Sequence, residues 1–151
     1  MIERVTKSVD TTQLMETYRE LLQSVDTLPL LVRGNSMAPF LVDGRDTVYL
    51  TRLDRPLKVG DIVLYKRTNG DYILHRICKV EGAAYCMIGD AHTVPEWGIS
   101  REQIFARVSW VQRKGKQQKP GCFWWFFFEK VWIRIIPLRP TLQRVYSLLF
   151  K

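Results

Sequence analysis

Long apolar runs are missing from this chain of 151 residues. Residues 1–10 hold no apolar segment of signal-peptide length, and no uncharged run elsewhere approaches the roughly 18 residues of a membrane span. We therefore expect neither a standard N-terminal export signal nor a transmembrane helix. The length suits one domain of ordinary size, which argues against a separate cofactor domain, and we expect no cofactor.

Cysteine is scarce as well. Cys78, Cys86 and Cys122 are odd in number, and none forms a CxxC pair or a His-rich cluster with metal-ligand spacing. We interpret them as unpaired thiols in a reducing compartment, because a lone cysteine usually behaves as a small hydrophobic residue. No structural metal is expected.

Acidic residues are almost absent from the last 40 positions. Residues 1–111 hold 14 Lys/Arg and 14 Asp/Glu, whereas residues 112–151 hold nine Lys/Arg and only Glu129, so the net charge of +8 belongs to this C-terminal part. The segment 112–120 is polar and cationic and lacks an apolar period. We predict a basic linker there, between a charge-balanced body and a basic tail.

The tail, residues 121–151, contains half of the 18 aromatic residues. Phe123–Phe128 is an uncharged aromatic block, and aromatic rings beside cations are typical of segments that lie in the lipid headgroup region. One helical face near the C-terminus carries four large apolar residues beside Arg144: Leu142, Val145, Tyr146 and Leu149.

We predict that this tail is helical and attaches the protein peripherally to a membrane surface. Packing against the body or a partner is the alternative, and nucleic acid is a less favoured partner. Because no N-terminal signal anchor is seen, we expect the cytoplasmic face. The oligomeric state is left open.

The body begins with a helical pattern and continues with strand patterns. Within residues 1–27, apolar residues recur at helical spacing after an N-cap at 10–12, which predicts an amphipathic helix over 12–25. Its expected apolar face contains Leu14, Tyr18, Leu21, Leu22 and Val25. Short β-type runs then predict strands at Leu28–Arg33, Asp46–Leu53, Ile62–Arg67, Asp71–Val80, Ala84–Ile88 and Ile104–Val111. Six short strands favour a mainly β domain over residues 28–111.

Asn69-Gly70 is the strongest turn signal, because this pair tolerates the positive φ angles of a two-residue type I′ turn. Such a turn would set Leu64 opposite His75 and Lys66 opposite Ile73. Lys66 and His75 would then be diagonal neighbours on one face of the hairpin.

Two positions could carry chemistry. Ser36 follows a Gly34-Asn35 corner, where its hydroxyl would project and backbone N–H groups could bind a developing oxyanion. His75 lies within a predicted strand. Taken alone, Ser36 is better explained as an ordinary turn serine, and His75 as a structural histidine.

Five segments, taken in order, resemble the signal peptidase I superfamily, which includes the self-cleaving domains of SOS and phage repressors. They are GNSMAP at 34–39, VGDIVLY at 59–65, HRI at 75–77, GD at 89–90 and IFARV at 104–108. The match spans about residues 30–111. It implies a mainly β, partly barrel-like catalytic domain and a serine endopeptidase activity.

The resemblance also implies residue roles. Ser36 aligns with the nucleophile, and His75 before Arg76 aligns with the general base of the histidine branch of the superfamily. Asp90 aligns with the acid that accompanies that histidine. A neutral imidazole can accept the serine proton, and a carboxylate can orient the ring. The alternative for Asp90 is a structural Gly-Asp turn after the strand that ends at Ile88.

Lys66 and Asn35 are candidate accessory residues of the site. Lys66 is a rival base, or a cation that lowers the pKa of His75, although its neighbour Arg67 and the nearby turn favour a solvated lysine. Gly34 occupies a position where many signal peptidases have serine, so Asn35 is a candidate oxyanion donor. His92 is interpreted as a surface-loop residue rather than a second base.

The resemblance places an extended peptide substrate between the predicted strands near Ser36 and His75. The expected substrate-binding residues are Leu31, Val32, Arg33, Gly34, Ile73 and Leu74. We predict a signal-peptidase-like serine endopeptidase that cleaves a leader or precursor at a membrane surface. An intracellular maturation or self-cleaving regulatory protease is one alternative, and a non-catalytic membrane-associated peptide-binding module is another. The absence of a helix-turn-helix pattern weakens a repressor assignment.

Overall fold

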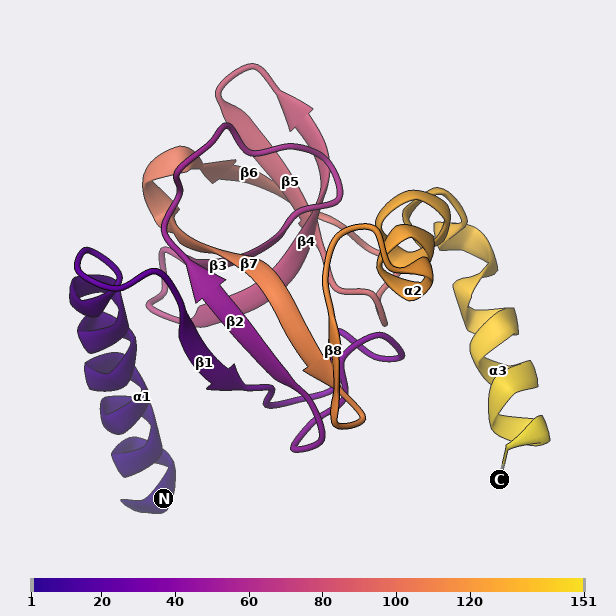
Figure 1. The fold of residues 1–151 in the computed structure, drawn as a ribbon, viewed down its shortest axis with the longest axis horizontal. Helices are drawn as coiled ribbons and strands as arrows, with labels where there is room; N and C mark the ends of the chain where they lie inside the picture. Colours follow the sequence, from indigo (N-terminus) through magenta and orange to yellow (C-terminus); the bar gives the residue numbers. More distant parts are fainter. Residues whose placement is uncertain (1, 151) are drawn as a thin grey trace.

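The protein is built on an open antiparallel sheet of eight strands (Figure 1). The computed structural model describes residues 2–150, with side chains from residue 11. The strands run in the order β1-β2-β7-β3-β4-β5-β6, and β8 pairs with β7. Their bounds are Leu28–Leu31 (β1), Thr47–Thr51 (β2), Ile62–Lys66 (β3), Tyr72–Glu81 (β4), Ala84–Ile88 (β5), Glu96–Ser100 (β6), Ile104–Arg113 (β7) and Lys116–Gln118 (β8). The predicted mainly β class is therefore confirmed.

Helical segments flank the sheet at its two sides (Figure 1). They are α1 (Ile2–Leu21), the short η1 (Arg101–Gln103), α2 (Phe123–Phe126), one π turn η2 (Phe127–Val131), two 3-10 turns η3 (Trp132–Arg134) and η4 (Ile136–Leu138), and α3 (Arg139–Leu149). Helix α1 lies on the side of β1, and α2 to α3 lie on the opposite side. Among the described residues, no helix combines the length and the apolar character needed to cross a bilayer.

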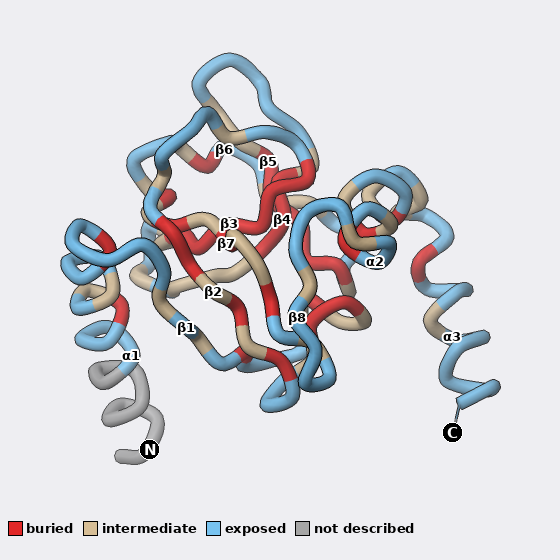
Figure 2. Tube along the Cα trace, viewed as in Figure 1, coloured by how far each residue is buried: buried red, intermediate tan, exposed pale blue. Residues whose placement is uncertain are grey.

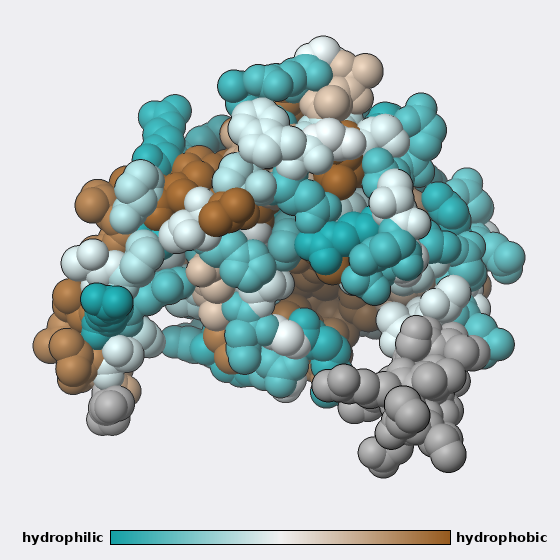
Figure 3. Space-filling model, turned by 180° about the vertical axis from the view of Figure 1, so that it is seen from behind, coloured by the Kyte–Doolittle hydropathy of each residue, from teal (hydrophilic) through white to brown (hydrophobic). Residues whose placement is uncertain are grey.

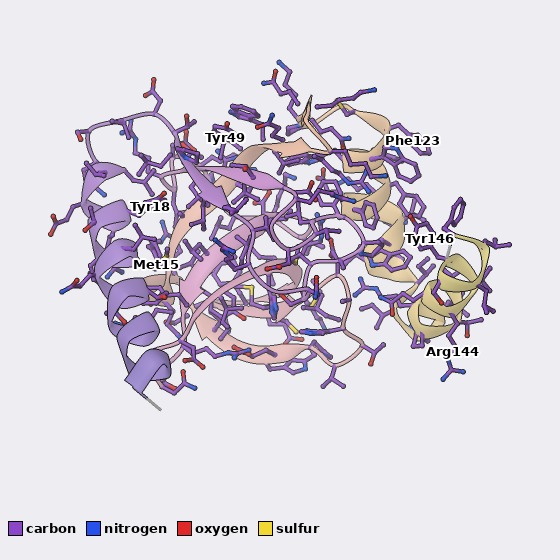
Figure 4. The ribbon with its side chains drawn as sticks, turned by 90° about the horizontal axis from the view of Figure 1, so that it is seen from below. Met15, Tyr18, Tyr49, Phe123, Arg144 and Tyr146 are labelled. Carbon is purple, nitrogen blue, oxygen red and sulfur yellow. The ribbon has the colours of Figure 1, made fainter. Side chains whose placement is uncertain are left out.

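The N-terminal helix differs from its prediction in bounds and in face. It begins at Ile2 rather than near residue 12, and it ends at Leu21. Met15 and Leu22 are buried, whereas Leu14 and Leu21 are exposed. The predicted apolar face is right for Tyr18 and Leu22, which pack against the main core, and wrong for Leu14, Leu21 and Val25, which are exposed. Spacing alone allows more than one stripe, and the sheet selects the one that contains Met15. Figure 4 shows Met15 and Tyr18 on the sheet-facing side of α1.

Two strands, β6 and β8, were not predicted from the sequence. The predicted linker 112–120 is instead the end of β7, a tight turn and β8, with Arg113 opposite Lys116. Lys114 and Gly115 both have positive φ, at 52° and 76°, as a two-residue type I′ hairpin requires. Strand β6 lies in a segment that was predicted to be a surface loop. It pairs with β5, and its apolar residues Trp97 and Ile99 alternate with Glu96, Gly98 and Ser100.

The β3–β4 hairpin has a register one residue away from the predicted one. Gly70 N–H donates to Arg67 O and Arg67 N–H donates to Asp71 O, which closes a loop of residues 68–70 with Gly70 at φ 97°. A three-residue loop of this type is the next most common hairpin connection. Val63 therefore lies opposite His75, and Lys66 lies opposite Tyr72. Because a shift of one residue exchanges the faces of a strand, Lys66 and His75 lie on opposite faces.

Strand β3 supplies two cores. Ile62 and Leu64 belong to a large apolar cluster, and Val63 and Tyr65 belong to a smaller one on the other face. In Figure 2, many of the buried residues lie in the central strands of the sheet. The large cluster also contains three residues of the predicted separate tail, Trp125, Phe128 and Trp132. The first part of segment 121–151 is thus part of the folded body, which corrects the predicted division of the chain.

Candidate active site

Ser36 lies in the connection between β1 and β2, on a corner that the backbone stabilises. Gly34 has φ 79°, a left-handed conformation that glycine adopts without strain, and its N–H donates to Asp43 Oδ1 at 2.7 Å. Asn35 O accepts a hydrogen bond from Ala38 N–H at 3.2 Å. These bonds hold Ser36 at a half-buried position.

A small cavity opens beside Ser36. Its volume is about 120 Å³, and it lies between the end of β1 and the start of β4. The lining residues are Val32, Arg33, Gly34, Ser36, Met37, Tyr72, Ile73 and Leu74. The cavity thus brings the proposed nucleophile together with the expected substrate-binding residues, apart from Leu31, which does not line it.

The strands beside this cavity leave backbone groups unpaired. In the described sheet, Tyr72–Leu74 pairs with β3 alone, because the pairing of β4 with β5 starts at Arg76. Strand β1 pairs with β2 alone. On β1, Pro29 has no N–H and its carbonyl oxygen accepts a hydrogen bond from the Tyr18 hydroxyl. An extended peptide that enters the cavity would therefore find main-chain partners at Tyr72–Leu74 and at the end of β1.

His75 is buried in the middle of β4, with 5% of its surface exposed. Its Nδ1 lies 3.4 Å from the hydroxyl of Tyr65, and its ring centroid lies 5.3 Å from that of His92. Burial, followed by the charges of His92 and Arg67, lowers the pKa of His75 to about 4. The ring is consequently neutral at pH 7, which is the state that a general base requires.

Gly89 is the point where the Ser36 loop meets the two histidines. A Cβ atom at this position would lie 2.5 Å from Ser36 O, 2.8 Å from His92 Nδ1 and 3.1 Å from His75 Nε2. Ala91 N–H also donates to Ser36 O at 3.0 Å. The carbonyl oxygen of Ser36 and Nε2 of His75 therefore both lie beside Gly89. No hydrogen bond joins the Ser36 hydroxyl to His75 within the described residues, and such bonds often tighten only when substrate binds.

Asp90 does not occupy the predicted position beside His75. Its two carboxylate oxygens accept hydrogen bonds from Arg76 Nε and Nη2 at 2.9 and 2.8 Å, and both side chains are buried. Consecutive strand residues point to opposite faces, so the bonds to Arg76 hold the Asp90 carboxylate on the face of β4 away from His75. The predicted role of Asp90 as the acid of the histidine was wrong, and the structural turn describes this residue.

Of the two accessory residues, the structure places Lys66 away from His75. Lys66 Nζ lies 3.8 Å from Glu16 Oε1 and 5.3 Å from the ring of Tyr72, on the face away from His75. The predictions of Lys66 as a rival base or as a cation beside His75 were therefore wrong. Asn35 is exposed, and its role as an oxyanion donor stays a prediction.

The tail holds the loop that follows β5, which the sequence did not predict. Arg139 is fully buried and donates to Gly89 O at 3.1 Å and to His92 O at 2.9 Å. Trp132 Nε1 donates to Asp90 O at 2.7 Å. The C-terminal segment thus holds the backbone of the loop after β5, which lies beside Nε2 of His75. No sequence pattern marks one arginine of a basic tail for burial, so only the fold could identify it.

A polar chain on the other side of His75 was also missed. Tyr65 donates to Glu96 Oε1 at 3.3 Å, and Arg67 Nη2 lies 2.6 Å from Glu96 Oε2. Tyr65 comes from β3 and Glu96 from β6, the strand absent from the prediction.

In comparisons with known proteins, no family model, curated protein or solved structure matches this chain.

Proposed function

We propose that this protein is a serine endopeptidase of the signal-peptidase kind, with a partly barrel-like β domain, in which Ser36 is the nucleophile and His75 the general base. One observation carries the proposal. The Ser36 backbone and Nε2 of a buried, neutral His75 converge on Gly89, beside a cavity bordered by unpaired strand edges. A weak nucleophile next to a neutral base is the arrangement that acyl transfer needs.

The reaction would follow the two steps of covalent serine catalysis. Ser36 Oγ attacks the carbonyl carbon of the scissile peptide bond while its proton moves to His75 Nε2. The imidazolium then protonates the departing amine, which leaves an acyl-enzyme, and His75 activates the water that hydrolyses this ester. Backbone N–H groups of the Ser36 corner and the side chain of Asn35 are candidate donors to the oxyanion.

The substrate class follows from the cavity. Its apolar lining residues and its small volume suit small or medium apolar side chains of an extended peptide. Arg33 is the one charged residue of the lining, and it lies next to the corner that carries Ser36. A leader or precursor segment in extended conformation is therefore the proposed substrate.

The C-terminal segment supports a location at a membrane surface. Its described part carries eleven exposed apolar residues: Phe123, Trp124, Phe126, Val131, Leu138, Leu142, Val145, Tyr146, Leu148, Leu149 and Phe150. In Figure 3, hydrophobic surface gathers over this side of the molecule, and Figure 4 shows Phe123 at its edge and Tyr146 on the side of α3 toward the body. Exposed Lys130, Arg134 and Arg144 lie among these residues. Aromatic rings and cations together suit an anionic lipid surface, on its cytoplasmic face.

The decisive experiment is cleavage of a peptide library by the full chain in detergent. We expect cleavage by the parent and by Ser147→Ala, whose hydroxyl is on exposed α3, and a loss of about 10²-fold or more in His75→Ala and Ser36→Ala. If both variants stay folded and cleave as well as the parent, the assignment is wrong. Peptide binding without turnover, unchanged in Ser36→Ala, would instead favour a peptide-binding module.

A further inference from the structure

A serine-histidine couple needs a group on the far nitrogen of the imidazole. That group holds the ring in one tautomer and stabilises the imidazolium that forms during attack. Asp90 is paired with Arg76 and does not reach His75. The observed hairpin register instead sets Tyr65 in the diagonal position beside His75, the position that the predicted register had assigned to Lys66.

Tyr65 is suited to accept a hydrogen bond at this position. It is fully buried, and its hydroxyl lies 3.4 Å from His75 Nδ1 and 3.3 Å from Glu96 Oε1. Burial, with the Glu96 carboxylate next in importance, raises the pKa of Tyr65, so the phenol keeps its proton. A phenol that donates its proton to Glu96 presents an oxygen lone pair to His75.

Glu96 is itself held in place. Arg67 Nε lies 2.8 Å and Nη2 lies 2.6 Å from Glu96 Oε2. A guanidinium with two contacts to one carboxylate restricts its orientation more than a single contact would. Arg67 also comes from the end of the hairpin that carries Tyr65 and His75, so one hairpin and β6 form the whole chain of contacts.

We propose that Tyr65, anchored by the Glu96–Arg67 pair, is the positioning residue of His75 and takes the place that a carboxylate holds in a Ser-His-Asp triad. His75 Nδ1–H donates to Tyr65, which leaves the Nε2 lone pair directed at Gly89 and the Ser36 loop. During attack one proton moves from Ser36 Oγ to Nε2, and Tyr65 and Glu96 keep their protonation states. The catalytic meaning of this arrangement rests on the proposed function, whereas the hydrogen bond does not.

The charges around His75 agree with this arrangement. His92 and Arg67 lower the pKa of His75, in addition to burial, and Glu96 raises it. Glu96 is therefore the group that favours the imidazolium, and Tyr65 lies between the two. With Tyr65, these are the titratable and charged groups that face His75 from β3, β6 and the loop after β5.

The test is the tautomer of His75, read by 15N NMR on the full chain at pH 7. The sequence has two histidines, so His92→Gln assigns the signals. We expect the Nδ1–H tautomer in the parent and in Tyr85→Phe, a control in the same apolar cluster, and a loss of that preference in Tyr65→Phe. The Nε2–H tautomer in the parent, or an unchanged tautomer in Tyr65→Phe, would overturn the proposal.

A second variant, Glu96→Gln, tests the same proposal if Tyr65→Phe does not fold. Glu96→Gln keeps the shape of the side chain and removes its charge, so the pKa of His75 should fall further. The same NMR titration measures it, and an unchanged pKa would count against the chain of contacts.

Activity supplies the catalytic readout. On a peptide that the parent cleaves, Tyr65→Phe should lower kcat by about 10- to 100-fold, less than the 10²–10⁴ that general base catalysis contributes, with little change in KM. Glu96→Gln should move the acidic limb of the pH–rate profile to lower pH. If the parent cleaves no peptide, the proposed function fails, and the NMR result still decides whether Tyr65 holds His75.

Discussion

At the scale of single residues, burial decides the chemical state of His75. A histidine on an exposed strand would have a pKa near 6.5, but this ring is 5% exposed, and the nearby charges of His92 and Arg67 also disfavour its charged form. The same environment that makes His75 available as a proton acceptor also links the stability of the fold to pH.

This linkage predicts an acid-sensitive fold. The pKa of His75 is about 4 in the folded chain against 6.5 ordinarily, so the unfolded chain binds more protons between these values. The stabilisation by neutral His75 is fully present above pH 6.5 and is lost as pH falls towards 4. In urea unfolding at pH 7 and pH 4.5, the free energy of unfolding should fall more in the parent than in His75→Gln. Equal decreases in the two proteins would show that His75 does not carry this effect.

At the scale of elements, a buried ion pair joins β4 to the loop after β5. Arg76 is 1% and Asp90 is 0% exposed, and the guanidinium also donates to Gly60 O at 2.8 Å. Removal of one partner would leave the other charge buried without compensation. We therefore assign the Gly89-Asp90 segment a structural role, as the support of the turn beside His75.

This role predicts a large loss of stability in Asp90→Asn. Breaking a buried pair costs about 3–5 kcal/mol, whereas an exposed pair contributes about 0–1 kcal/mol. The control is Glu81→Gln, which breaks a bridge of 2.7 Å to Lys79 between side chains that are 54% and 56% exposed. Urea unfolding compares the two variants. If Asp90→Asn keeps the stability of the parent and loses only activity, Asp90 acts on catalysis and our correction is wrong.

At the scale of the whole molecule, the C-terminal segment has two sides with different roles. Trp125, Phe128 and Trp132 complete the main core, and Arg139 holds the loop beside His75. The opposite side of the same segment is apolar and exposed. A surface contact of this segment would thus lie close to the candidate active site in the fold, although 46 residues or more separate Arg139 from His92 and Gly89 in the chain.

We predict binding to anionic lipid through this exposed side. The full chain should bind vesicles of phosphatidylcholine with phosphatidylserine more tightly than phosphatidylcholine alone, and salt should weaken this difference because it screens exposed charges. The double variant Phe123→Ser and Phe126→Ser should lose binding, whereas Trp97→Ser, an exposed aromatic of β6, should keep it. Vesicle sedimentation measures both. Equal binding by all three proteins would contradict the prediction, as would concentration-dependent self-association removed by the double variant.

Much of the sheet could be predicted from local patterns. Six strands were expected close to where they lie, because alternating apolar residues between turn signals reflect one buried face of each strand. Strand β6 was missed because it is short and Gly98 interrupts its pattern, and strand β8 was missed because its residues, Lys116–Gln118, are all polar.

The sequence by itself determined the mainly β class, the corner at Ser36 and the position of His75 within a strand, because periodicity and turn chemistry act over a few residues. Only the tertiary structure decided which groups meet His75. One extra residue in the 68–70 loop moves Lys66 to the far face and sets Tyr65 beside the imidazole. In the buried interior, Asp90 forms an ion pair with Arg76, and Arg139 donates a hydrogen bond to Gly89 O. Such choices depend on register and on pairing across distant segments, which the local pattern of a chain does not contain.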